Sequence, residues 1–243
     1  MTNVIIIGAG IAGLSCARRL ADAGLNVIVI DKGRGIGGRV ATRRAGDLRF
    51  DHGAPHLSTK EGGFSNVLQN LCDSSHAAPW IDNTGKAWSV GTPGMSAIPK
   101  GMAVGLDVQL ETQVRKVVPN GSDWCVHCDD RQLDARHVVI TVPAPQVAGL
   151  LGAQHPLVAQ IADVEMSPSL TLMAAVSGDA PTVRLGEPND PLALITHDSI
   201  KPGRPQMATP HGSCRRGWRS ATRILKTICP ISRRGCYLCF ATV

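Results

Sequence analysis

The chain has 243 residues, enough for one complex domain or two small ones. Hydrophobic residues make up 43% of the chain and charged residues 18%, which is ordinary for a globular protein and excludes an intrinsically disordered one. No run approaches the roughly 20 apolar residues that span a membrane, and the N-terminus lacks the basic segment of a secretory signal. We therefore expect a cytoplasmic protein without a membrane partner.

The net charge of +6 is concentrated at the C-terminal end. Residues 201–243 contain nine of the 25 basic residues and no Asp or Glu, so the first 200 residues carry a net charge of −3. This distribution argues against a nucleic-acid partner for the body of the protein. The last thirty residues also hold four of the eight cysteines, and a disulfide framework is not expected in the cytoplasm.

The chain opens with a strand–helix–strand pattern. Residues 4–7 are a short apolar run, which is typical of a buried parallel strand. Apolar residues then recur at helical spacing over residues 11–23, and Gly24 is placed to end that helix. Residues 27–30 form a second apolar strand that closes on Asp31. A right-handed crossover makes the two strands parallel neighbours.

The remaining pattern is less regular. Residues 32–60 are rich in Gly and Arg without a clear period, and we expect an extended functional loop there. The later elements that the pattern predicts are a helix over residues 64–71, edge strands around Trp80 and Trp88, a helix opened by residues 93–96 and running to 102, an antiparallel pair at 108–118 and 124–128, a strand at 138–142 followed by a helix, and a strand at 170–176.

A Gly8-x-Gly10-x-x-Gly13 motif lies where the first strand meets the first helix. Gly8 allows the tight turn, Gly10 lets the backbone approach a pyrophosphate, and Gly13 lets the helix and strand pack closely. The amides at the helix N-terminus then face the phosphates. Asp31 is placed to accept a hydrogen bond from a ribose hydroxyl. The motif in this context predicts a Rossmann-type dinucleotide-binding unit.

A second glycine cluster, Gly37-Gly38-Arg39, favours FAD over NAD as the dinucleotide. It allows the backbone to approach a long ligand a second time, and Arg39 can add a charge-assisted contact to its phosphate. A nicotinamide-dependent dehydrogenase has no need of this cluster. We interpret Arg34, Arg43 and Arg44 as a solvated basic loop.

Residues 4–57 resemble the FAD-binding start of the amine-oxidase-like flavoproteins, and most closely that of the renalases and their bacterial relatives. The resemblance is carried by residues 7–14, 31–32, 37–39 and 51–56, and it continues more loosely to about residue 205 through 93–96, 141–146 and 199–204. It implies an FAD-dependent oxidoreductase that transfers a hydride from a small substrate to flavin N5. Dioxygen then reoxidises the flavin and yields hydrogen peroxide. Renalases oxidise dihydronicotinamide isomers, whereas other relatives oxidise amines.

We predict a set of FAD contacts from the motif and the resemblance together. They are Gly8, Gly10, Ile11, Ala12, Gly13, Asp31, Lys32, Gly38, Arg39, Pro55 and His56. The family usually carries Gln and an aromatic residue where this chain has Pro55 and His56. His56 is therefore interpreted equally as a flavin neighbour or as a loop histidine. No catalytic dyad is expected, because the flavin supplies the redox chemistry and the protein supplies orientation and electrostatics.

The resemblance also implies the fold class: α/β, with a Rossmann-like FAD-binding domain around a parallel sheet and a smaller, incomplete α+β substrate domain. We expect residues 1–60 and 101–150 in the first domain and residues 61–100 and 151–205 in the second. Residues 206–243 then form an aberrant basic tail, for which our hypothesis is a reading-frame change or a truncated gene. The alternative is a true basic tail for anionic partners.

Other readings stay open. Two CxxC pairs, Cys125/Cys128 and Cys236/Cys239, offer four zinc ligands, but the cysteines of the first pair diverge on a strand and over 100 residues separate the pairs. We therefore expect no metal. The alternatives to a renalase-like enzyme are a flavin amine oxidase or desaturase, and a non-catalytic nucleotide-binding remnant. The oligomeric state is not indicated.

Overall fold

The computed structural model describes residues 3–58, 63–167, 169–175, 184–185, 193–205, 211–217 and 237–242. The chain forms two compact units, each built from two stretches of sequence. Unit 1 comprises Met1–Gly38 and Met102–Met166, and unit 2 comprises Arg39–Gly101 and Ser167–Val243. In the described part of the chain, every helix is too short or too polar to cross a membrane.

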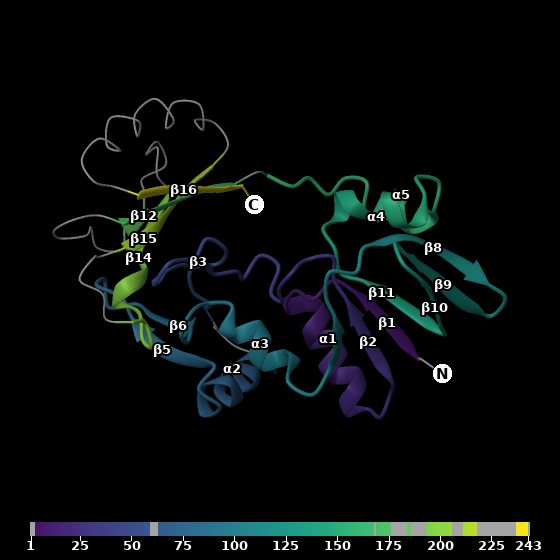
Figure 1. Ribbon diagram of the computed structural model, residues 1–243, viewed down its shortest axis with the longest axis horizontal. Helices are drawn as coiled ribbons and strands as arrows, with labels where there is room; N and C mark the ends of the chain where they lie inside the picture. Colours follow the sequence, from purple (N-terminus) through teal and green to yellow (C-terminus); the bar gives the residue numbers. More distant parts are fainter. Residues whose placement is uncertain are drawn as a thin grey trace. The chain divides into compact units, whose positions relative to one another are not determined.

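Unit 1 is built on a four-stranded parallel sheet with the order β11-β1-β2-β7, of which β11, β1 and β2 are labelled in Figure 1. The strands are β1 (Val4–Ile7), β2 (Val27–Ile30), β7 (Asp107–Gln109) and β11 (His137–Ile140). Helix α1 (Ile11–Asp22) connects β1 to β2. The predicted strand–helix–strand start and the α/β class with a parallel sheet are confirmed.

The second layer of unit 1 is a three-stranded antiparallel sheet with the order β10-β9-β8, followed in the chain by β11 and two helices. Its strands are β8 (Val114–Asn120), β9 (Asp123–Cys128) and β10 (Gln132–Ala135), and the helices are α4 (Ala144–Leu151) and α5 (Pro156–Gln160).

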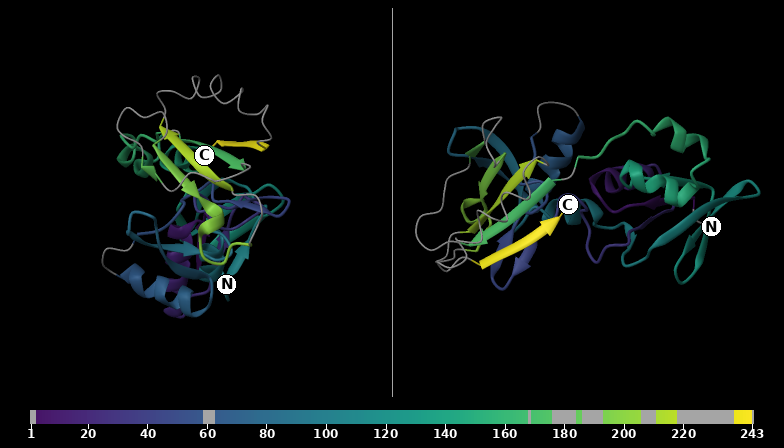
Figure 2. Two further views of the ribbon diagram at one scale, coloured as in Figure 1. Left: turned by 90° about the vertical axis from the view of Figure 1, so that its left-hand side faces the viewer. Right: turned by 90° about the horizontal axis from the view of Figure 1, so that it is seen from above.

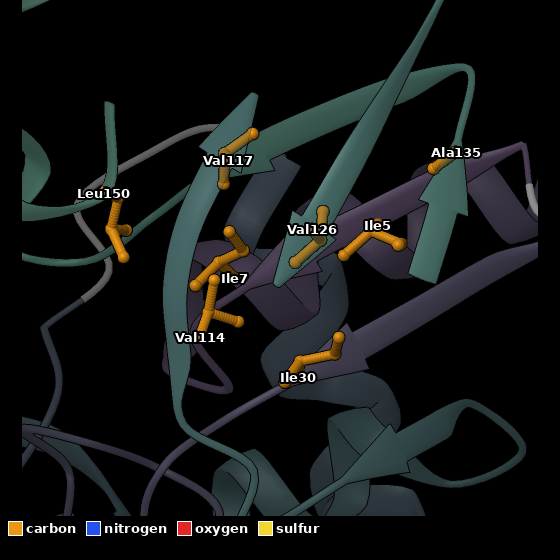
Figure 3. Packing of buried hydrophobic residues seen from close by; sticks show 8 residues of the cluster. All are labelled: Ile5, Ile7, Ile30, Val114, Val117, Val126, Ala135 and Leu150. Atoms are coloured by element: carbon orange, nitrogen blue, oxygen red, sulfur yellow. The ribbon is translucent and has the colours of Figure 1, made fainter. Parts of the chain in front are cut away.

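Both faces of β1 are buried, which explains why all four of its residues are apolar. Val4 and Ile6 point to the side of α1, where they pack with Ala17. Ile5 and Ile7 point to the opposite side, into a cluster that contains residues of β8, β9, β10 and α4 (Figure 3). Because both faces of β1 are packed, the strand and the turn that follows it are held in place.

In its described residues, unit 2 contains two β-hairpins, two helices and a five-stranded sheet. The hairpins are β3 (Arg43–Ala45) with β4 (Leu48–Phe50) and β5 (Ala77–Ile81) with β6 (Ala87–Gly91), and the helices are α2 (Gly63–Asp73) and α3 (Ala97–Ala103). The last two residues of α3, Met102 and Ala103, belong to unit 1.

The five-stranded sheet of unit 2 has the order β13-β14-β15-β12-β16. Four of its strands, β14, β15, β12 and β16, are labelled in Figure 1, and Figure 2 shows them in two other views. Its members are β12 (Ser169–Ala175), β13 (Arg184–Leu185), β14 (Leu194–His197), β15 (His211–Gly217) and β16 (Tyr237–Thr242). A 3-10 turn, η1 (Asp198–Ile200), follows β14. Thus residues 211–217 and 237–242 of the expected tail pair as strands, while 206–210, 218–236 and 243 lie outside the described residues. The hypothesis of a frame change stays a hypothesis.

Two expectations about local structure are wrong. The predicted strand 108–118 is two strands, β7 and β8, because the chain bends at Glu111, whose φ of +53° is incompatible with a continuous strand. The loop predicted for 32–60 contains the hairpin of β3 and β4. Residues 39–60 also join unit 2, which makes it larger than unit 1. The division into functional domains stays a prediction.

Candidate functional site

The turn between β1 and α1 needs glycine at two positions for the fold itself. Gly8 has a φ of +114°, and its amide donates to the carbonyl of Ile30 at 2.8 Å. A methyl group on Gly13 would lie 1.9 Å from the carbonyl oxygen of Gly8 and 2.9 Å from Oγ1 of Thr141. Both glycines therefore bring α1 close to the end of β1.

Gly10 is glycine for a different reason. Its φ of −81° and ψ of 178° are open to any residue. A methyl group built on it would meet nothing within 4 Å in the described part of the chain. Neither the backbone conformation nor the packing inside the protein thus explains the missing side chain. Glycine here keeps open the space in front of the N-terminus of α1.

The N-terminus of α1 can accept an anion. Gly10 is the N-cap; among the described residues no side chain caps the helix, and its first turn contains no acidic residue. The amides of Ile11, Ala12 and Gly13 lack an intrahelical acceptor, as the first amides of any α-helix do. These amides and the helix dipole favour a phosphate group. Free amides beside such an open position are the groups that a dinucleotide diphosphate needs.

Asp31, at the end of β2, braces the same turn. Its Oδ2 accepts a hydrogen bond from the amide of Ala9, and its Oδ1 accepts one from the amide of Gly33, both at 2.7 Å. Each carboxylate oxygen has a second lone pair, so a ribose hydroxyl can still donate to it. Sequence reasoning predicted only the ribose contact. The bracing of the glycine-rich turn is an additional role.

The second glycine cluster lies against the first. The amide of Gly37 donates to the carbonyl of Ala9 at 2.9 Å, and Gly37 forms a parallel bridge with Gly10. Gly37 and Gly38 have φ values of +126° and +53°, which favour glycine. The prediction that two glycine clusters approach one ligand is consistent with this geometry. Lys32 is exposed nearby in sequence, with its Nζ 3.2 Å from Oε1 of Gln146.

The other predicted contacts, Arg39, Pro55 and His56, belong to unit 2. The carbonyl of Arg39 accepts a hydrogen bond from the amide of Ala54 at 2.7 Å. A methyl group on Gly53 would lie 2.4 Å from that same carbonyl oxygen. Arg39 and the segment before His56 therefore form one closely packed patch. The side chain of Arg39 is exposed, and Pro55 is buried.

The ring of His56 stacks on Trp88, with 3.7 Å between ring centroids and 33° between planes. Trp88 is itself held by the hairpin of β5 and β6, because its Nε1 donates to Oδ2 of Asp82 at 2.8 Å. Burial raises the pKa of Asp82, but hydrogen bonds from Thr84, Trp88 and Lys86 outweigh it and lower that pKa to about 2. The ring of His56, in the loop between β4 and α2, is thus packed against Trp88, and its place beside a flavin stays a prediction.

A buried charge cluster in unit 2 was not predicted. It consists of Asp51, Asp198, Lys201 and Arg204, whose ionic side chains touch one another with no exposed side-chain area at Asp51, Lys201 or Arg204. Burial raises the pKa of Asp51, but the charges of Lys201 and Arg204 outweigh it, and the pKa lies below its usual value. Asp51 and residues 199–204 occur in the blocks that carried the resemblance, but nothing in their order indicated that they meet.

The structure therefore brings most predicted site residues together within unit 1. These are Gly8, Gly10, Ile11, Ala12, Gly13, Asp31 and Gly38. It groups Arg39 with the segment leading to Pro55 and His56 in unit 2. Contact of any of them with FAD stays a prediction. Of the first CxxC pair, Cys125 is buried and faces Oε1 of Gln132 at 3.7 Å, and Cys128 is half-buried.

Comparisons with known families agree with this geometry. The profile of the NAD(P)-binding Rossmann-like domain matches residues 6–74. The profile of the flavin-containing amine oxidoreductases matches residues 64–185, which is half of the chain. The expected Rossmann-like fold and FAD as the cofactor are confirmed at the level of the family.

Individual relatives are similar over short stretches. A phytoene desaturase from Fusarium fujikuroi is 41% identical over 69 residues, which cover 28% of this chain and 12% of the desaturase. The L-amino acid oxidase Cdc18 from Crotalus durissus cumanensis is 47% identical over 58 residues, or 24% of this chain and 12% of the oxidase. The matches thus span only about an eighth of these curated relatives.

The fold is similar over a much longer stretch. The structure of cyclohexylamine oxidase from Brevibacterium oxydans superposes with a TM-score of 0.71 over 92% of this chain and 77% of that one, at 15% sequence identity. At this identity the likeness concerns the fold alone.

Proposed function

Because the chain belongs to the flavin-containing amine oxidoreductases, we propose that it binds FAD and oxidises a small substrate by removing a hydride. The observation that carries the proposal concerns Gly10. In the described part of the chain, neither its backbone conformation nor its packing requires glycine, and its missing side chain leaves the N-terminus of α1 open. The first turn of α1 lacks acidic residues that would repel a diphosphate.

We assign the cofactor contacts by chemistry. The amides at the start of α1 would hold the diphosphate, and Asp31 would accept a ribose hydroxyl. Gly38 and Arg39 would approach the ligand a second time, and Lys32 would lie beside the adenosine half. Pro55 and the stacked ring of His56 would form part of the wall that faces the flavin, which we call the flavin-facing wall.

A bound flavin would supply the redox chemistry, namely acceptance of a hydride from the substrate and reoxidation by dioxygen, which with a further proton gives hydrogen peroxide. The residues of this chain bind and orient the reactants. The substrate class that the resemblance favours is a dihydronicotinamide isomer, which would leave as NAD(P)⁺.

A second candidate is amine oxidation, favoured by the family profile over residues 64–185. In that case the substrate loses a hydride from carbon and a proton from nitrogen and leaves as an imine. Both candidates need the same FAD site, so the substrate alone separates them.

The test is substrate profiling of protein reconstituted with FAD and freed of excess flavin. Oxygen uptake and peroxide release are measured with dihydronicotinamides reduced at unusual ring positions and with a panel of primary amines. We expect one peroxide for each dihydronicotinamide isomer oxidised. Activity with amines alone would instead establish the second candidate, and bound flavin without any oxidation would indicate a non-catalytic nucleotide-binding protein.

A further inference from the structure

The buried charge cluster of unit 2 joins two segments that lie about 150 residues apart in the chain. The ammonium of Lys201 lies 2.9 Å from Oδ2 of Asp51 and also contacts Oδ1 of Asp198. The guanidinium of Arg204 contacts Asp51 and donates to the carbonyl of Gly91 at 3.2 Å. Two carboxylates and two cations leave the cluster without net charge.

Lys201 has a third partner outside the ionic groups. Its Nζ donates to the carbonyl oxygen of Pro55 at 2.9 Å. The three donors of the ammonium thus meet three acceptors: two carboxylates and this carbonyl. Proline has no amide hydrogen, so the carbonyl is the whole hydrogen-bonding capacity of the Pro55 backbone. One hydrogen bond to this oxygen comes from a side chain 146 residues away.

The same cluster holds the start of the segment that leads to Pro55. The amide of Asp51 donates to Oδ2 of Asp198 at 3.1 Å, and Oγ of Ser213 donates to the carbonyl of Asp51 at 3.0 Å. After Pro55, the amide of Leu57 donates to the carbonyl of Ser89, which neighbours Trp88 in β6. The segment is therefore fixed on both sides of His56.

Stability alone does not account for a lysine at this place. A buried ion pair often contributes no more stability than apolar residues of the same volume, because both charges lose their hydration. What an apolar side chain cannot do is hold a carbonyl oxygen in one position. Arginine could not replace this lysine, because its donors lie in one plane on several nitrogens, whereas here three acceptors surround the single nitrogen of Lys201.

We infer that Lys201 is a positioning residue: it fixes the carbonyl of Pro55 and thereby the ring of His56, so that the flavin-facing wall depends on the segment 198–204. This inference rests on the proposed function, because it takes Pro55 and His56 as part of that wall. Lys201 acts through Pro55 and touches neither substrate nor flavin.

The test separates positioning from charge balance. Lys201→Met leaves the cluster with one excess negative charge, whereas Asp198→Asn/Lys201→Met restores neutrality but not the bond to Pro55. The control is Lys100→Met, which removes an exposed lysine of the same unit. For each protein we would measure the melting temperature without flavin, the FAD dissociation constant, and the circular dichroism of the bound flavin bands.

We expect the double variant to regain most of the melting temperature that the single variant loses. Its FAD dissociation constant should stay about 10- to 100-fold above that of the wild type, the range seen when a residue that orients a metal ligand is mutated. The flavin dichroism should also change, while Lys100→Met matches the wild type throughout. Equal FAD affinity and dichroism in the double variant and the wild type would overturn the inference, as would failure of both Lys201 variants to fold. Failure of the wild type to bind FAD would overturn the proposed function instead.

Discussion

Alanine at Gly13 should lower stability, whereas alanine at Gly10 should lower FAD affinity alone, although the two positions are three residues apart. At Gly13 the added methyl group would lie 1.9 Å from the carbonyl oxygen of Gly8, whereas real Cβ atoms keep at least 3.0 Å. Helix α1 would have to move by about 1.1 Å from the end of β1. We expect Gly13→Ala to cost about 1–3 kcal/mol, or about 2–12 °C in melting temperature.

At Gly10 the methyl group meets nothing within 4 Å in the described part of the chain, and the φ of −81° accepts alanine. The flavin-free protein should therefore keep its free energy of unfolding within about 0.5 kcal/mol. The methyl group would, however, occupy the space assigned to the diphosphate. Losing one charge-assisted hydrogen bond of about 1.5–3 kcal/mol weakens binding about 10- to 100-fold.

Chemical unfolding of the flavin-free proteins and titration with FAD measure the two effects separately. The assignment of the space in front of α1 to the diphosphate would be refuted if Gly10→Ala bound FAD as tightly as the wild type. A large loss of stability in Gly10→Ala would show that its glycine serves the fold after all.

Three further predictions concern carboxylates. Asp31→Ala should lower both stability and FAD affinity, since the amides of Ala9 and Gly33 lose their acceptor at about 1–3 kcal/mol each. Calorimetry measures the stability and titration the affinity, and an effect on FAD affinity alone would contradict the bracing role. Asp82→Asn should lower the melting temperature and change the near-ultraviolet dichroism of Trp88. The carboxamide would place a donor where Trp88 or the hairpin amides need an acceptor. Unchanged dichroism would argue against the hairpin holding that ring. The lowered pKa of Asp51 means that its ionised form stabilises the fold above about pH 4, and that this contribution is lost as the pH falls through the folded-state pKa. Unfolding free energies between pH 6 and pH 3 should thus fall more steeply in the wild type than in Asp51→Asn, and equal slopes would contradict the shift.

The opening of unit 1 could be predicted because local signals agree there. The all-apolar β1, the helical spacing of α1 and the acidic end of β2 each indicate the same strand–helix–strand unit. The reason lies in burial: β1 is covered on both faces, so no polar residue interrupts the pattern.

The errors have equally physical causes. The exposed arginines of β3 give no alternation of apolar and polar residues, so the hairpin with β4 left no signal. The break between β7 and β8 depends on the positive φ of Glu111. Glutamate seldom adopts a positive φ, so the sequence does not indicate a break there.

The charge cluster was missed for another reason. Charged residues usually lie at the surface, and their pairing across about 150 residues is set by tertiary structure. The order of residues in a single sequence does not indicate such pairing. Lys201 and Arg204 lie close together in the sequence, but only the structure shows that both contact Asp51.

The most direct test is a titration of flavin-free protein with FAD and, separately, with FMN, which lacks the diphosphate-linked adenosine half. If the turn between β1 and α1 holds the diphosphate, FAD should bind with one site per chain, ADP should compete with it, and FMN should bind far more weakly. Equal affinity for FMN and FAD, or no competition by ADP, would contradict that assignment.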